Sequence, residues 1–508
     1  MKTPSLPPPL WGQLFALTDS TGLPLQTRLR LKVVQAILDG HLSAGAALPS
    51  SRHLAEVLKL SRNTVTAVYQ QMIDEGYLES RVRSGVFVRA QACPGPVVDA
   101  RRLVDPFSAE MPGPAAELPQ WSPRVLRSLR RQPTLSKPQH WREFPYPFIY
   151  GTHDAQLFPT EDFRECCVRT LARSQLSNWT PDFEVDDAPD LIDQIRTRLL
   201  PKRGVFAQPE EILITVGAQH AFHLVAEALF DTATRVGFED PGYPHARNVF
   251  SLRTSALVGI PVDAEGLVVD ALPALDYVFV TPSHQSPTTR TLSLERRQWL
   301  LRKAALQDFV VIEDDYEAEN LYEGDPMPAL KSLDKTGRVI YIGSVSKNLS
   351  PALRLGYIVA QKALIAELRV LRHAMVRHPS AFLQQAYALF LSLGYHDAHA
   401  RRVNHVLSQR MDATQKAMAR HLPGFACTVA QGGASVWVKA PDWLDGGALA
   451  LRARRHGVLV EPGDVFFASP PRPCPYFRLR LSSIEAAKIE PGIHALRRAV
   501  DEMVRELV

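Results

Sequence analysis

One lysine of the sequence stands where it can form a Schiff base. Lys347 closes the run Tyr341–Lys347, in which an apolar strand leads into a Ser-x-Ser sequence, and Arg354 follows shortly afterwards. The hydroxyl of Ser344 and the forked guanidinium of Arg354 are suited to hold a phosphate group beside that lysine. The pattern therefore indicates a phosphorylated aldehyde bound to Lys347; the alternative is an ordinary surface lysine.

An acidic sequence after another strand supplies groups for an aromatic ring. Asp314 and Tyr316 lie in Val310–Tyr316, which begins as an apolar strand. Open α/β sheets bind ligands at the carboxyl ends of their strands, where Asp314 is expected. Its carboxylate can pair with a pyridine nitrogen and keep the ring an electron sink, and Tyr316 can hydrogen-bond a ring hydroxyl. The alternative is an acidic metal site, but no histidine lies nearby in the sequence and we predict no metal.

Three shorter signals fit the same ligand. Gly217 lies between an expected strand and an expected helix, where free backbone N–H groups can bind phosphate. Tyr243, in the sequence Glu239–Pro244, can stack on an aromatic ring, although a packed turn tyrosine is the simpler interpretation. Ser286 lies at the carboxyl end of a further strand. These signals are weak singly and gain weight from occurring together.

The elements that must position these groups alternate between strand and helix from about residue 146. Strands are predicted at Glu211–Val216, Arg235–Phe238, Tyr277–Thr281, Phe309–Glu313 and Val339–Ile342, with helices such as Ala218–Phe230 and Leu294–Leu306 between them. Apolar strands alternating with helices indicate a largely parallel sheet with both faces covered. After about residue 372 helices and a few strands predict a smaller α+β lobe.

The first 90 residues follow another pattern. Three helices and a hairpin are expected between about residues 20 and 90, with Ser61 capping the third helix and Gly76 ending it. This is the layout of a winged helix-turn-helix, in which the third helix enters the major groove of DNA. A small helical protein–protein module has the same spacing and remains the alternative.

Polar residues at the start of that third helix can contact DNA. Arg62 can be bidentate to guanine and Asn63 to adenine, while neighbouring hydroxyls bind phosphate. The residues predicted to bind DNA are Arg52, Ser61, Arg62, Asn63, Thr64, and, in the wing, Arg83 and Gly85.

Composition agrees with this division. The chain has 508 residues with a net charge of +5, and residues 1–90 hold ten Lys and Arg against six Asp and Glu. An excess of basic residues in this N-terminal part suggests a polyanionic partner, although a solvated basic surface would give the same count. Between residues 91 and 145 frequent prolines and an arginine cluster indicate a linker. No apolar run is long enough to span a membrane, and five scattered cysteines fit a reducing cytoplasm.

Longer stretches resemble a known family. Leu48–Arg52, Leu60–Val65 and Gly76–Val88 are similar to the DNA-binding domain of the GntR family. The order of EDPGYP, TPSHQ, IEDDY, SVSK and PALRLGY resembles the MocR subfamily of GntR regulators, over residues 20 to 508. That subfamily joins a winged helix to a fold-type I, aspartate-aminotransferase-like domain that binds pyridoxal 5'-phosphate (PLP).

The resemblance implies specific roles. Lys347 would be the Schiff-base lysine and the one catalytic residue, and Arg480 would bind a substrate or effector carboxylate, with Arg478 on the same strand face as a competing candidate. The residues predicted to bind the cofactor are Lys347, Asp314, Tyr316, Ser344, Arg354, Gly217, Ala218, Gln219, Tyr243 and Ser286.

The chain departs from aminotransferases in one loop. Ser286-Pro287-Thr288-Thr289 stands where those enzymes carry Asn-Pro-Thr/Ala-Gly, so the asparagine that helps hold the ring hydroxyl is missing. A cofactor site can remain without it, but efficient transamination is not expected. The first hypothesis is therefore a regulator, and the alternative is an active PLP-dependent aminotransferase that carries a DNA-binding module.

The resulting prediction is an α/β protein in three parts. Residues 1–90 form the winged helix-turn-helix domain, 91–145 the linker, and 146–508 a PLP-dependent transferase-like unit with a small lobe from about 372. It would be a cytoplasmic transcriptional regulator that senses PLP, an amine or an amino acid through an internal aldimine. The family further implies a head-to-tail homodimer that reads two half-sites of promoter DNA and lacks any membrane association.

Overall fold

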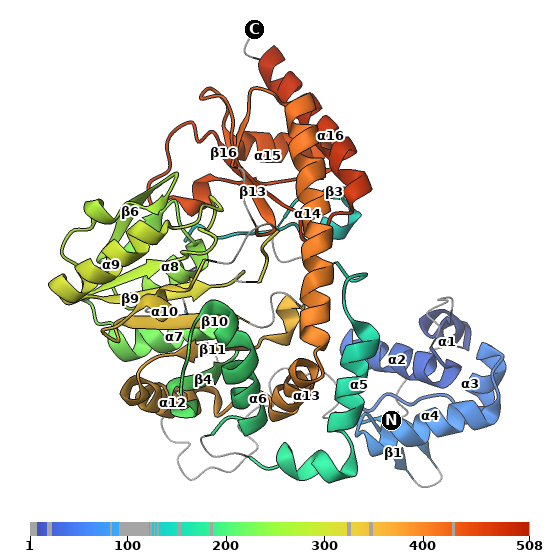
Figure 1. Ribbon diagram of the computed structural model, residues 1–508. Helices are drawn as coiled ribbons and strands as arrows, with labels where there is room; N and C mark the ends of the chain where they lie inside the picture. Colours follow the sequence, from blue (N-terminus) through green and yellow to red (C-terminus); the bar gives the residue numbers. More distant parts are fainter. Residues whose placement is uncertain are drawn as a thin grey trace, which may run out of the picture. The chain divides into compact units, whose positions relative to one another are not determined.

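The computed structural model describes residues 8–17, 23–81, 84–90, 121, 124–125, 128–129, 132–149, 154–182, 186–317, 319–322, 327–344, 349–428 and 432–506. The chain divides into two compact units, Met1–Trp121 and Ser122–Val508 (Figure 1). Each unit has a hydrophobic core of its own.

The first unit is a winged helix-turn-helix, as predicted. Its elements are α1 (Pro8–Leu14), α2 (Leu25–Leu38), α3 (Ser51–Leu58), α4 (Arg62–Asp74), β1 (Leu78–Arg81) and β2 (Gly85–Val88). The side chains of Ser50 and Ser61 cap α3 and α4 by accepting from the backbone N–H groups of His53 and Thr64. The apolar face of α4 is buried against α2 and α3, which is why a helix of only 13 residues is stable here.

The second unit is built on an eight-stranded sheet in the order β4-β11-β10-β9-β8-β5-β6-β7. The strands are β4 (Ile212–Thr215), β5 (Val236–Asp240), β6 (Leu257–Asp263), β7 (Gly266–Leu267), β8 (Tyr277–Val280), β9 (Val310–Asp315), β10 (Val339–Ser344) and β11 (Gly356–Val359). Strands β10, β9, β8, β5 and β6 pair in parallel, whereas β11 and β7 pair antiparallel to their neighbours. The largely parallel sheet is thus confirmed. Strands β6, β7 and β11 are additional to those that the sequence predicted.

Helices cover both faces of this sheet (Figure 1). Helices α7 (Gly217–Leu229), α8 (Pro244–Phe250) and α12 (Lys362–Val376) pack on one face. Helices α6 (Pro189–Gln194) and α13 (Ala381–Ser392), with α5 (Thr160–Thr170), cover part of the other face, which α9 (Leu294–Gln307) and the short α10 (Leu330–Leu333) extend. Because both faces are buried, the central strands read as continuous apolar runs.

The long helix α14 (Tyr395–His421) leads into the smaller α+β lobe. There a four-stranded antiparallel sheet has the order β12-β13-β16-β15, formed by Ala426–Cys427, Ser435–Lys439, Tyr476–Arg480 and Glu461–Pro462. Helices α15 (Gly446–Arg455) and α16 (Ala486–Arg505) pack on it, and β14 (Val458–Leu459) pairs with β3 (Tyr146–Pro147). None of the helices in the described part of the chain is long and apolar enough to cross a membrane.

Candidate functional site

Three strand ends bring predicted cofactor-binding residues together. Asp314 lies opposite Ile342 in the β9–β10 register, so Asp314 and Ser344 stand at the same edge of the sheet. Ser344 in turn lies opposite Gly356 of β11, and Gly356 lies opposite Thr215 of β4. The side chain of Asp314 is buried, and Tyr316 follows directly.

The start of α7 forms a close contact with Arg354. Gly217 has φ of +72°, and a Cβ added to it would lie 3.0 Å from Nη2 of Arg354. That same nitrogen donates to the carbonyl oxygen of Val216 at 3.1 Å. A guanidinium is therefore held beside the first turn of a helix, where Gly217, Ala218 and Gln219 have N–H groups with no partner inside the helix. This combination of donors suits a phosphate group. A side chain at position 217 would contact the guanidinium, so only glycine leaves room for Arg354 there.

The aromatic and loop candidates lie on neighbouring elements. Tyr243 precedes α8 and its ring makes an edge contact with Phe222, with centroids 6.3 Å apart. Ser286 is buried, and its backbone N–H donates to the hydroxyl of Thr281 at 3.0 Å. Thr289, which replaces the glycine of aminotransferases, has φ of +61° and so keeps a glycine-like backbone.

A buried glutamate organises that loop. One carboxylate oxygen of Glu239 accepts from the backbone and hydroxyl of Thr281 at 3.2 and 2.6 Å and from the amide of Gln285 at 3.2 Å. Burial raises the pKa of Glu239 to about 7, although these hydrogen bonds oppose the rise. Glu239 was not predicted as a functional residue.

Two predicted residues, Lys347 and Arg83, lie outside the described residues. The neighbours of Lys347, from Tyr341 to Ser344, form the end of β10, as the sequence predicted.

Glu313 and Asp315 of strand β9 lie on the face of the sheet opposite to Asp314. Asp315 accepts from Nε of Arg203 at 2.8 Å and from the hydroxyl of Tyr341 at 2.9 Å, and all three side chains are buried. Burial would raise the pKa of Asp315, but the Arg203 guanidinium, together with hydrogen bonds from Ser283 and Tyr341, lowers it. Sequence reasoning missed Arg203, because no local pattern marks it and its partner is 112 residues away.

The two arginines of β16 have different partners. Arg480 forms a buried ion pair with Glu317, and its Nη1 lies 3.5 Å from the hydroxyl of Ser435. Arg478 donates from Nε to Glu461 at 2.6 Å, while its Nη2 is buried and has no hydrogen-bond partner among the described residues. Both guanidiniums act electrostatically on Tyr316. The sequence did not predict a role for Glu317, which forms an ion pair with Arg480, the arginine that the sequence favoured.

The predicted DNA-binding residues lie on the surface of the first unit. Arg52, Ser61, Arg62, Asn63 and Gly85 are exposed, and Thr64 is half-buried. Ser61 accepts from the backbone N–H of Thr64 at 3.1 Å, and the two hydroxyls lie 2.8 Å apart. Gly85 has φ of +111°, which fixes the hairpin turn of the wing.

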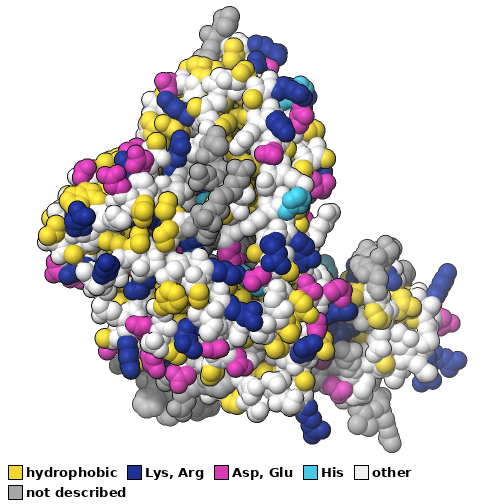
Figure 2. Space-filling model, viewed as in Figure 1, with side chains coloured by type: hydrophobic (Ala, Val, Ile, Leu, Met, Phe, Trp, Pro, Cys, Tyr) yellow, Lys and Arg dark blue, Asp and Glu magenta, His cyan; other side chains and the backbone are white. Residues whose placement is uncertain are grey.

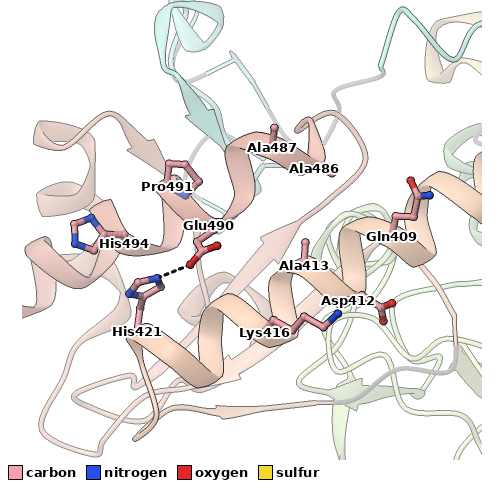
Figure 3. Close-up of a pocket in the computed structure, with 10 residues that line it drawn as sticks. All are labelled: Gln409, Asp412, Ala413, Lys416, His421, Ala486, Ala487, Glu490, Pro491 and His494. Atoms are coloured by element: carbon pink, nitrogen blue, oxygen red, sulfur yellow. Dashed lines mark hydrogen bonds and ion pairs between the residues drawn. The ribbon is translucent and has the colours of Figure 1, made fainter.

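The smaller lobe carries a separate surface pocket of about 770 Å³ between α14 and α16. Figure 3 shows His421 of α14 facing Glu490 of α16, and their side chains lie 3.3 Å apart. None of the predicted functional residues lines this pocket. On the face seen in Figure 2, Lys and Arg side chains of the second unit are mixed with Asp and Glu, without a large area of one sign.

Two protein families match the chain. Residues 25–88 match the bacterial regulatory proteins of the gntR family, and residues 174–496 match aminotransferase class I and II. The matches fall on the winged helix-turn-helix unit and on the unit with the eight-stranded sheet, as the sequence predicted.

Relatives that match nearly the whole chain are regulators. The chain is 40% identical over 477 residues to the HTH-type transcriptional regulator TauR of Rhodobacter capsulatus, covering 94% of this chain and 96% of that regulator. It is 32% identical to the probable rhizopine catabolism regulatory protein MocR of Rhizobium meliloti, covering 96% of each chain. Both matches include the DNA-binding unit and the aminotransferase-like unit.

Solved structures match the second unit. The α-aminoadipate aminotransferase LysN of Thermus thermophilus, complexed with N-(5'-phosphopyridoxyl)-L-leucine, is 28% identical with a TM-score of 0.66. The match covers 73% of this chain and 96% of LysN. The similarity to enzymes thus stops short of the whole chain, whereas the similarity to regulators does not.

Proposed function

The chain belongs to the MocR subfamily of GntR-family transcriptional regulators, and on that premise we propose that it regulates transcription in response to PLP together with an amine or amino acid. The regulator, rather than the alternative of an active aminotransferase, is what the whole-chain relatives support. The observation that carries the sensing role is the close approach of Arg354 to Gly217, which puts a guanidinium beside the backbone N–H groups at the start of α7, a combination that suits a phosphate.

The described residues supply groups for each part of the cofactor. Asp314 would pair with the ring nitrogen, Tyr316 would hydrogen-bond the ring hydroxyl, and Tyr243 would stack on the ring. Ser344, Arg354 and the backbone of Gly217–Gln219 would hold the phosphate, and Ser286 would line the ring. PLP bound to Lys347 supplies an electrophilic carbon that an effector amine can attack.

The acidic group of the effector would bind on β16. Arg480 already has Glu317 as an ion-pair partner, whereas Nη2 of Arg478 is a buried donor without a partner among the described residues. A buried donor without an acceptor is costly, so a ligand oxygen there gains the full hydrogen bond. This favours Arg478, the competing candidate, as the arginine that contacts the effector, with Arg480 and Glu317 forming the wall beside it.

The family supports a proposal for the assembly and its target. We propose a cytoplasmic homodimer, arranged head-to-tail, whose two winged helix-turn-helix units read two half-sites of promoter DNA. Effector binding would shift the dimer between two arrangements of these units, which requires that the ligand bind one arrangement more tightly.

The test measures DNA affinity as a function of cofactor and amine. Full-length protein is first used to select an operator from random duplex DNA, and its affinity for that duplex is then measured with and without PLP while amines and amino acids are added. We expect at least one amine to change the affinity of the PLP-loaded protein and to have no effect on Lys347→Ala. Equal DNA affinity under all these conditions would refute the proposal.

A second measurement separates the two arginines. Arg478→Gln should raise the effector concentration needed for half response by about 10- to 100-fold, the usual loss for a charge-assisted hydrogen bond. Arg480→Gln should leave that effector concentration nearly unchanged, while both variants should lower the unfolding temperature, because Glu461 and Glu317 would each be buried without a cation.

A further inference from the structure

A second polar pocket lies behind Tyr316. It has a volume of about 390 Å³ and is bounded by the short helix η8 (Leu200–Arg203), the ends of β9 and β10, and the first turns of α14. Tyr316 and Ser344 line it, but Gly217, Arg354 and Asp314 do not. The pocket therefore adjoins the proposed cofactor site and shares Tyr316 and Ser344 with it.

Most of the charges in this pocket neutralise one another. Arg203 pairs with Asp315 at its base. At its rim His396 contacts Glu319 at 3.2 Å and Asp397 at 3.4 Å, and the ammonium of Lys202 lies 2.5 Å from Asp397. Burial alone would lower the pKa of His396, but Glu319 and Asp397 raise it to about 9, so this imidazole is a cation at neutral pH.

Two neighbouring side chains of α14 remain available. Arg401 lines the pocket and is exposed, and none of the described acidic residues pairs with it. Asn404 also lines the pocket; its amide nitrogen donates to the carbonyl oxygen of Glu319 at 2.7 Å. Its amide oxygen is buried and has no partner among the described residues. Residues three apart on a helix share a face, so the cation and the acceptor stand side by side.

We propose that this pocket binds a small carboxylate that also carries a hydroxyl or amino group. The carboxylate pairs with Arg401, and the hydroxyl or amino group donates to the amide oxygen of Asn404. Four cations and three carboxylates line the pocket, so a monoanion balances its charge. The volume lies within the range of small-metabolite sites. The proposal does not depend on the PLP-dependent response, although Tyr316 and Ser344 belong to both sites.

The test uses a ligand that has no amine and so cannot react with PLP. Binding of L-lactate to the full-length, PLP-loaded protein is measured by titration calorimetry, with propionate, which lacks the hydroxyl, as the matched ligand. We expect one L-lactate per chain and weaker binding of propionate. Arg401→Ala should weaken the binding of L-lactate by about 10- to 100-fold. Asn404→Leu should abolish the difference in affinity between L-lactate and propionate.

Two control variants make the result specific. Arg402→Ala removes the adjacent arginine, which lies 3.5 Å from Asp162 and does not line this pocket, and should leave binding unchanged. Arg478→Ala tests for binding at β16 instead. The proposal is wrong if no L-lactate binds up to about 10 mM, or if binding persists in Arg401→Ala. Loss of binding in Arg478→Ala alone would also overturn it. Unfolding curves of each variant identify any that fail to fold.

Discussion

The two units prepare their functional side chains in opposite ways. In the winged helix-turn-helix unit most of the predicted DNA-binding residues are exposed, and their hydrogen bonds are local, such as the cap that Ser61 makes on α4. In the aminotransferase-like unit the polar residues near the proposed cofactor site are buried and paired with residues far along the chain, as Arg203 is with Asp315. A site for a macromolecule can leave its groups in water until the partner arrives. A site for a small molecule must fix them beforehand.

The largest expected effect contrasts a buried ion pair with an exposed one. Arg203→Met leaves Asp315 buried without its cation and should lower the free energy of unfolding by about 3–5 kcal/mol. Arg30→Met removes the partner of Glu75 on the first unit, where both side chains are about a quarter exposed, and should cost less than about 1 kcal/mol. Denaturant unfolding of each unit measures both values, and equal losses would break the comparison.

A smaller effect is expected at the phosphate end of the proposed site. Gly217→Ala places a methyl group 3.0 Å from the Arg354 guanidinium and should weaken PLP binding by about 100-fold, since both partners must shift. Gly394→Ala is the matched control, because Gly394 also has a positive φ but open space around it. Spectroscopic titration with PLP gives both affinities. Equal weakening by the two variants would mean that backbone strain, and not the contact, is responsible.

In the winged helix-turn-helix unit, the loss of a single contact to a DNA base should reduce the free energy of DNA binding moderately. Arg62→Ala and Asn63→Ala should each weaken binding to the selected operator by about 1–3 kcal/mol while leaving the unfolding temperature unchanged, because both side chains are exposed. Gln70→Ala, farther along the same helix, serves as the control. A change in stability comparable to the change in affinity would contradict the division between exposed and buried sites.

An effect of similar size concerns the pH dependence of the buried loop. The pKa of Glu239 is raised from 4.5 to about 7 in the folded state, so the folded protein binds a proton that the unfolded chain releases. Its contribution to stability is therefore present below about pH 4.5 and is lost as pH rises through 7. Glu239→Gln should remove this loss. Between about pH 5 and pH 8 the free energy of unfolding of the variant should therefore fall by about 1–3 kcal/mol less than that of the unaltered protein. Thermal unfolding at the two pH values measures it; an unchanged difference would show that Glu239 titrates normally.

Local signals explain what the sequence could predict. Capping serines, a wing glycine and apolar runs fixed the winged helix-turn-helix and most of the parallel strands, because each depends on residues close together in the chain. Asp314, Ser344 and Gly217 could be chosen for the same reason: each stands at the end of an apolar strand, and such ends meet at one edge of a sheet.

Pairings between distant residues could not be predicted. Glu317 and Arg480 are separated by 163 residues, and nothing in either local sequence indicates that the two form an ion pair. Strand β11 was missed for a similar reason, since its antiparallel place between β10 and β4 depends on register rather than composition. Lys347, on which the cofactor hypothesis rests most heavily, remains a prediction from sequence.

Helix α14 has 27 residues and so extends for about 40 Å without interruption. Its first turns carry Arg401 and Asn404, its middle carries Arg410, which pairs with Asp154, and its last turns enter the core of the smaller lobe through Met418. Such a rod works as a lever arm. A tilt of about 5° imposed at one end of the helix would displace the other end by about 3.5 Å, so a small adjustment at the proposed metabolite pocket would be enlarged at the smaller lobe.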